Sequence, residues 1–206
     1  MRLKQPKKRY EELTVEKARL ISHLIGDGCV YNHKGDYNIK YEVSDKQLLD
    51  LFYKDLLKVY GLKPFTGTNP SGKTGKLISY VRLRSRKVYD DLLRYTSYFS
   101  EDWKINKEIK QSSLILKKEF LRAFFDDEGS VIPEGEKAII RLYSINLLGL
   151  KQIREILSEF KIETHFQKGF GLKRNVHALV IKDIKRFDKL IGFNLKRKQE
   201  KLKEFL

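Results

Sequence analysis

The stretch Leu20-Ile21-Ser22-His23-Leu24-Ile25-Gly26-Asp27-Gly28 is an apolar run that ends in an acid and a glycine. A second run of this kind, Leu121-Arg122-Ala123-Phe124-Phe125-Asp126-Asp127-Glu128-Gly129, lies about half a chain later. Burying a lone carboxylate on an apolar helix is costly. Two such carboxylates at the ends of two packed helices would lie side by side, an arrangement that suits divalent metal ions.

Small residues favour the packing of these two runs against each other. Ser22 and Gly26 are four residues apart and therefore share one face of a helix, and Ala123 takes the position of Ser22 in the second run. Small residues on facing surfaces let two helices approach closely. The sequence therefore predicts a helix pair from which Asp27 and Glu128 emerge together at one end.

The rest of the chain reads as two similar halves. Asp27 and Glu128 are 101 residues apart, and Ser44 and Ser144 are 100 residues apart. Repetition at so long a period indicates a duplicated domain. Apolar spacing predicts the same order of elements in both halves. The expected helices are 14–26, 47–60, 85–95, 113–127, 147–160 and 183–191, and the expected strands are 37–43, 63–68, 77–83, 130–132, 138–143, 163–167 and 176–181.

These elements predict an α+β protein made of two αββαββα units. Gly28 is expected to end the first helix in a left-handed conformation, and Gly61 and Gly129 are expected to end two later ones. The expected parts of the chain are a basic N-terminal arm at 1–12, a first unit at 13–98, a linker at 99–112, a second unit at 113–192 and a basic C-terminal helix at 193–206.

Composition limits the class of partner. The 43 Lys and Arg residues exceed the 27 Asp and Glu residues, and the net charge of +16 favours nucleic acid over an anionic membrane. No stretch approaches the roughly 20 apolar residues of a transmembrane helix, and the first ten residues lack the apolar core of a signal peptide. Cys29 is the only cysteine, which excludes an intrachain disulfide. We expect an intracellular protein of the cytoplasm or nucleoid, or of an organelle if an organellar intron encodes it.

The two apolar runs resemble the two copies of the LAGLIDADG motif in single-chain homing endonucleases. They match the motif at its last acid, its last glycine and the apolar pattern before them, and the order of elements is similar over nearly the whole chain. The resemblance implies a pseudo-twofold monomer in which two antiparallel, saddle-shaped sheets cover double-stranded DNA and the motif helices form the interface. It also implies metal-dependent hydrolysis of both strands of a long, specific DNA site.

By the same resemblance, Asp27 and Glu128 are the catalytic acids that bind Mg²⁺ or Mn²⁺. Gly26 and Asp127 are the further residues of the expected metal site, although Asp127 stands where the family usually has a small interface residue. The bound ions would activate water and stabilise the leaving oxygen.

The chain departs from the family at a second place. Members often carry Lys or Gln after the second strand of each half, whereas the matching positions here are Asp45 and Ile145. Asp45 and its neighbour Lys46 are therefore the candidates for supporting cleavage. The departure favours a second hypothesis, a weakly active or inactive protein that acts as a maturase on intron RNA or as a DNA-binding regulator.

Strand alternation predicts one sheet face for the helices and one for the major groove of DNA. In the first half, Asn38, Lys40 and Glu42 alternate with apolar residues and are expected to face DNA. The other expected DNA contacts are Lys34, Thr66, Thr68, Lys73, Lys76, Arg82 and Arg84 in the first half and Arg141, Gln167, Lys168, Lys173, Arg174 and His177 in the second.

The segment 67–74 matches the phosphate-binding pattern G-x-x-x-x-G-K-[ST]. That motif needs a buried strand before it and a helix directly after it, but here the strand-like run 77–83 follows. We therefore expect a hairpin tip. The competing hypothesis, a nucleotide-hydrolysing enzyme, predicts ATP binding that Lys73→Ala abolishes.

Overall fold

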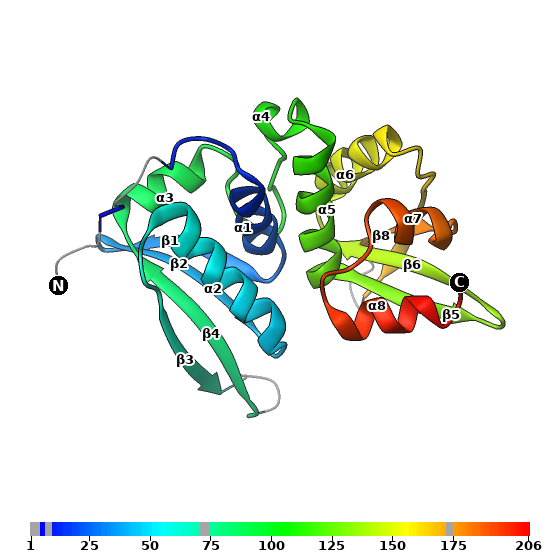
Figure 1. Ribbon diagram of the computed structural model, residues 1–206, viewed down its shortest axis with the longest axis horizontal. Coiled ribbons are helices and arrows are strands. Elements are labelled where there is room, and N and C mark those ends of the chain that lie inside the picture. The colour runs from blue at the N-terminus through cyan, green and yellow to red at the C-terminus, as the bar shows by residue number, and fades with distance from the viewer. Residues whose placement is uncertain (1–4, 7–9, 71–74, 172–174) are drawn as a thin grey trace.

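The computed structural model describes residues 5–6, 10–70, 75–171 and 175–206, which form two units side by side (Figure 1). The first unit comprises helices α1 (Val15–Gly26), α2 (Lys46–Tyr60) and α3 (Arg86–Leu93) and strands β1 (Gly28–His33), β2 (Asp36–Val43), β3 (Phe65–Pro70) and β4 (Leu77–Arg84). Helix α4 (Lys107–Lys110) precedes the second unit, which comprises α5 (Leu114–Glu128), α6 (Leu147–Glu159) and α7 (Ile184–Leu190) and strands β5 (Gly129–Glu134), β6 (Lys137–Ser144), β7 (His165–Phe170) and β8 (Val176–Ile181). Helix α8 (Lys196–Lys203) follows.

Each unit contains a four-stranded antiparallel sheet, with strand orders β1-β2-β4-β3 and β5-β6-β8-β7. Helices α2 and α3 pack on the first sheet, and α6 and α7 pack on the second. Alternation places Ile39, Tyr41 and Val43 of β2 in the core and leaves Lys40 and Glu42 on the other face. The predicted duplicated α+β fold is therefore confirmed.

Helices α1 and α5 pack against each other in the centre of the molecule (Figure 1). The Ser22 hydroxyl donates to the main-chain oxygen of Phe120 over 2.7 Å, and Ala123 is fully buried. Apolar side chains of both helices belong to one continuous core. Small residues thus allow the close helix contact that the sequence predicted.

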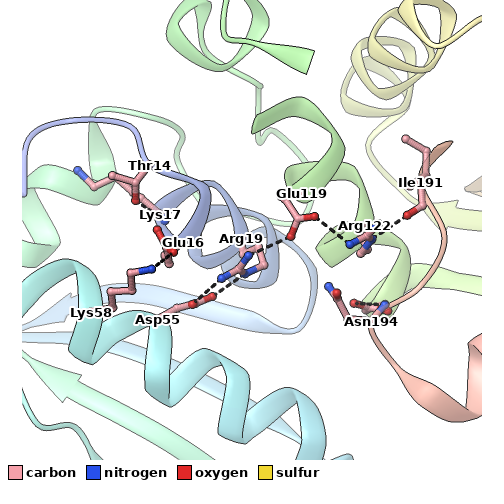
Figure 2. A network of polar contacts seen from close by, with 11 residues as sticks. Thr14, Glu16, Lys17, Arg19, Asp55, Lys58, Glu119, Arg122, Ile191 and Asn194 are labelled. Carbon is pink, nitrogen blue, oxygen red and sulfur yellow. Dashed lines mark hydrogen bonds and ion pairs between the residues drawn. The ribbon is translucent and has the colours of Figure 1, made fainter. Parts of the chain in front are cut away.

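Charged groups also join the two units across this interface. The Arg19 guanidinium of α1 binds Asp55 of α2 and Glu119 of α5 (Figure 2). Glu119 also accepts a hydrogen bond from Arg122, whose Nε donates to the main-chain oxygen of Ile191. The network holds α1, α2 and α5 in one arrangement.

The glycines after the two motif helices do not have the predicted role. Gly28 does not adopt the left-handed conformation but begins β1, and a Cβ atom on it would lie 2.6 Å from the Cα atom of Leu24. At Gly129 a Cβ atom would lie 2.6 Å from the main-chain oxygen of Phe125. Glycine is needed at both places because each strand returns close to its helix, whereas Gly61, with φ of 63°, ends α2 as predicted.

The predicted linker 99–112 contributes buried side chains to the core. Trp103 is buried, and its ring lies 5.3 Å from that of Phe124. In the candidate phosphate loop, Gly67 belongs to β3, and the next element in the described part of the chain is strand β4 and not a helix. Lys73 lies outside the described residues. Among the described residues, no helix combines the length and apolar character needed to cross a membrane.

Candidate active site

Asp27 and Glu128 lie together where the two motif helices end, Asp27 as the C-cap of α1 and Glu128 as the last residue of α5. Burial, together with the nearby charge of Asp127, raises the pKa of Asp27 to about 6. Burial and the charges of Asp27 and Asp127 raise the pKa of Glu128 to about 7. The surrounding protein removes part of the water around the Asp27 carboxylate, although the residue as a whole stays exposed. The two acids therefore repel each other at an accessible position.

The two carboxylates have the character of cation ligands. Within the described residues, neither carboxylate has a hydrogen bond that would offset its negative charge. A divalent cation beside them would hold both in the ionised form. The described ranges contain no group of three or more His, Cys, Asp or Glu residues arranged to hold a metal. Asp27 and Glu128 would therefore share the ion with water, phosphate or main-chain oxygens, as is common for Mg²⁺.

Asp127 points into the helix interface and away from the predicted metal site. Its Oδ2 lies 2.9 Å from Nδ1 of His23, its Oδ1 accepts a hydrogen bond of 2.5 Å from the Tyr41 hydroxyl, and its carboxylate is fully buried. Burial alone would lower the pKa of His23, but the Asp127 carboxylate outweighs it and raises the pKa. Because both oxygens are engaged, the prediction of Asp127 as a side-chain metal ligand is wrong.

At the two positions where the family often has Lys or Gln, Asp45 forms an ion pair and Ile145 lines a cavity. Asp45 binds the Arg197 guanidinium, with Oδ2 2.8 Å from Nη2, and this contact lowers the pKa of Asp45. Ile145 lines a cavity of about 250 Å³ beside Glu128. Lys46 lines a different cavity, between α2 and strands β3 and β4. None of these three side chains places a positive charge beside Asp27 and Glu128.

A cation near the two acids, Lys198, was not among the residues predicted from the sequence. Lys198 of α8 donates from Nζ to the main-chain oxygens of Phe125, Asp126, Asp127 and Gly129, at 3.2, 2.5, 3.3 and 2.5 Å. Its charge lowers the pKa of both Asp27 and Glu128 and so opposes the effect of burial. The sequence offered no signal for this contact beyond the basic character of the tail.

The strand register decides which predicted DNA contacts of the first sheet face outward. Lys40, Glu42, Arg82 and Arg84 lie on the face opposite the helices. Asn38 shares that face but is only 1% exposed, and its amide donates to the main-chain oxygen of Asp36. Lys34 lies in the turn between β1 and β2, and Lys76 precedes β4.

Two residues of this sheet that were predicted to contact DNA lie on the face covered by helices. Thr66 is opposite Val81 and Thr68 is opposite Ser79, so both threonines lie on the side that packs against α2. Thr66 and Thr68 therefore do not share the open face with Lys40 and Arg82, because their side is set by a strand register that the sequence did not reveal.

In the second sheet, Arg141 and Gln167 lie on the open face, opposite Val180 and Ala178. Lys168 and His177 are opposite each other on the face that carries the core residue Leu179, so their assignment to the open face is wrong. Lys173 and Arg174, like Lys73 in the first unit, lie outside the described residues.

The open faces of the two sheets differ in character. On the second sheet, Ile139, Ala178 and Val180 point to the open face and are buried there, apart from the main core. The Phe170 ring contacts Tyr143 on the same face, with ring centroids 5.4 Å apart. This surface is apolar at its centre, whereas Lys40, Glu42 and Arg82 make the first surface polar.

Comparisons with known proteins agree with the fold and the motif. A family model for a LAGLIDADG-like domain matches residues 116–192. The homing endonuclease I-ApeI of Aeropyrum pernix is 25% identical and aligns over 89% of this chain and 86% of its own length. Uncharacterized protein MJ0398 of Methanocaldococcus jannaschii is 25% identical over 93% of this chain and 71% of its own length.

A solved structure of I-DmoI in complex with DNA and Mn has a similar fold. It superimposes with a TM-score of 0.63 and 16% sequence identity, covering 87% of this chain and 97% of I-DmoI. At that identity the likeness concerns the fold, and it includes both units and the helix pair between them.

Proposed function

Because this chain belongs to the LAGLIDADG family, in its single-chain two-motif form, we propose that it is a site-specific double-strand DNA endonuclease that uses Mg²⁺ or Mn²⁺. The observation that carries the proposal is the pairing of Asp27 and Glu128 at the ends of α1 and α5. One chain supplies both acids, so a monomer is sufficient.

The chain's own residues would prepare the reaction in two ways. Asp27 and Glu128 would hold the metal at the interface of the two units, where the charge of Asp27 helps to raise the pKa of Glu128 and a cation would keep both acids ionised. Asp127 fixes the ends of the two motif helices through His23 and Tyr41. A divalent ion held there supplies an activated water and a positive charge for the leaving oxygen.

The open sheet faces are the proposed DNA surface. The net charge of +16 suits a polyanion. The related protein I-ApeI is named a homing endonuclease, and the I-DmoI structure contains DNA. The side chains that we propose as contacts are Lys34, Lys40, Glu42, Lys76, Arg82, Arg84, Arg141 and Gln167.

The experiment starts from the genomic sequence on either side of the reading frame. Joining the two flanks reconstructs the uninterrupted site, which is cloned into a supercoiled plasmid. We expect the protein to linearise this plasmid with Mg²⁺ or Mn²⁺ and to leave it intact with EDTA. A plasmid that carries only one flank is the control. Tight binding of the joined site without any cleavage under these conditions would contradict the proposal.

A second function is favoured by one observation. Asp45 is bound to Arg197, and Ile145 lines the cavity beside Glu128, so neither position provides the Lys or Gln that the family often has. This favours a binder without cleavage activity, either a maturase for intron RNA or a DNA-binding regulator. Binding of the flanking intron transcript in preference to the joined DNA site would support the maturase.

A further inference from the structure

The segment 194–198, which precedes and begins α8, contacts both units next to the paired acids. The Asp126 carboxylate at the end of α5 accepts hydrogen bonds from the main-chain nitrogens of Asn194 and Leu195, at 3.3 and 2.9 Å. On the other side, Arg197 binds Asp45, and the main-chain nitrogen of Lys196 donates to Gln47 over 3.0 Å. The segment therefore joins the end of α5 to the beginning of α2.

Within this segment, Lys198 makes the contact nearest to the acids. The last main-chain carbonyl groups of an α-helix receive no hydrogen bond from within the helix. A cation near that end stabilises the helix. Lys198 donates to four main-chain oxygens there, and those of Asp127 and Gly129 lie on either side of Glu128. All four acceptors belong to α5 and the first residue of β5, so Lys198 acts on the second unit's acid.

Glu128 needs such support because its carboxylate has no hydrogen bond of its own within the described residues. We propose that Lys198 is a positioning residue of the catalytic centre, an inference that rests on the proposed function. By binding the main chain on both sides of Glu128, Lys198 fixes the turn from α5 to β5. The Glu128 carboxylate is thereby held beside Asp27 before metal and DNA bind.

Two other roles for Lys198 make different predictions. A helix cap with a purely structural role would add stability without affecting metal binding. A competing cation would weaken metal binding through its positive charge. The three roles therefore separate in a measurement of metal affinity on the full chain without DNA.

The test compares Lys198→Met with Lys201→Met, which removes an exposed lysine from the same helix. Mn²⁺ binding is followed by electron paramagnetic resonance, at a temperature where circular dichroism shows both variants folded. We expect Lys198→Met to weaken Mn²⁺ binding about tenfold, the lower end of the usual effect of residues that orient metal ligands. Lys201→Met should bind as the wild type does. Unchanged or tighter Mn²⁺ binding in Lys198→Met would overturn the proposal.

A second variant covers the case in which Lys198→Met does not fold. Lys198→Cys, made in a Cys29→Ser background, is alkylated with bromoethylamine, which restores an amine on a side chain of nearly the same length. We expect the alkylated protein to regain Mn²⁺ affinity. Failure of alkylation to restore the affinity would overturn the proposal, because the amine would then not be what positions Glu128.

Cleavage gives an independent readout. Because Lys198 contacts the end of α5 and not that of α1, its loss should slow one strand more than the other, and nicked plasmid should accumulate. A general loss of folded protein would slow both strands alike. If the wild type does not cleave at all, the proposed function fails, whereas the Mn²⁺ measurement still decides the role of Lys198.

Discussion

Asp127 fills the space that faces Gly26: a Cβ atom on Gly26 would lie 2.8 Å from both Cβ and Oδ2 of Asp127. The missing side chain at Gly26 lets the carboxylate of the second unit enter the first unit, where it meets His23 and Tyr41. The two motif helices therefore place different residue types at their contact. A small residue of α1 faces an acid of α5, and that acid is structural.

Asp127→Asn tests this structural role. The amide keeps the shape of the side chain but loses the charge that His23 faces across 2.9 Å. Loss of a buried, charge-assisted hydrogen bond should lower the free energy of unfolding by about 1–3 kcal/mol. Urea unfolding measures this loss, and Mn²⁺ binding should be weakened less than in Asp27→Asn, because Asp127 acts on the two acids only through its nearby charge. A loss of Mn²⁺ binding as large as that in Asp27→Asn would show that Asp127 is a metal ligand after all.

Arg19→Met tests the polar network between the units (Figure 2). Arg19 makes two contacts of 2.8 Å with Asp55 and one of 2.9 Å with Glu119, and its removal leaves the buried Asp55 without its partner. Breaking one side of a buried pair typically costs about 3–5 kcal/mol.

The matched control for Arg19→Met is Lys58→Met. The Lys58 side chain is 70% exposed in its pair with Glu16, and exposed pairs contribute about 1 kcal/mol or less. Chemical unfolding of both variants measures the difference. Equal destabilisation by the two substitutions would mean that the Arg19 network does not hold the units together.

The pKa values of Asp27 and Glu128 predict a dependence of stability on pH. In the folded protein these pKa values are about 6 and 7, above the ordinary values of 3.8 and 4.5. Between the ordinary and the raised values the folded state binds more protons than the unfolded state, so the free energy of unfolding contributed by these groups falls as pH rises.

Asp27→Asn and Glu128→Gln remove this effect. Each substitution should therefore raise the melting temperature at pH 8 in EDTA, where wild-type Asp27 and Glu128 are both ionised and repel each other. At pH 4 both acids are protonated, and the difference from the wild type should disappear. Differential scanning calorimetry at the two pH values measures it. Variants less stable than the wild type at pH 8 would show that the acids do not repel each other in the folded protein.

The two open sheet faces predict unequal reading of the two halves of the DNA site. Lys40, Glu42 and Arg82 offer hydrogen bonds on the first sheet, and each mismatched base pair they read should cost about 1–3 kcal/mol. The apolar centre of the second sheet, around Ile139 and Val180, offers few such contacts. Binding of a series of singly substituted sites measures the profile, and equal losses in both halves would contradict this prediction.

The sequence alone was sufficient to predict the order of elements, apart from strand β1 and the short helix α4, and the placement of Asp27 and Glu128 at the ends of the two motif helices. Both follow from local patterns. Amphipathic spacing marks each helix, hydroxyl caps such as Thr14 and Ser113 start the two motif helices, and the repeat sets the correspondence between halves.

The errors concern contacts that local patterns do not encode. Thr66 was assigned to the wrong face because strand register is a property of the pairing, and a shift of one residue moves every side chain to the other face. Lys168 lies next to an irregularity in the pairing of β7 with β8, which alternation cannot reveal. Lys198 reaches α5 from α8, far along the chain, and a surface lysine there would look the same in the sequence.

The central claim is that Asp27 and Glu128 together bind the metal ion on which DNA cleavage depends. The most direct test is cleavage of the joined-flank plasmid by Asp27→Asn and Glu128→Gln, with DNA binding measured in parallel by gel shift in Ca²⁺. We predict that each substitution lowers the cleavage rate by a factor of about 10²–10³, as expected when a group that stabilises the transition state is lost, while affinity for the DNA is kept. Cleavage at the wild-type rate by either variant would contradict the claim.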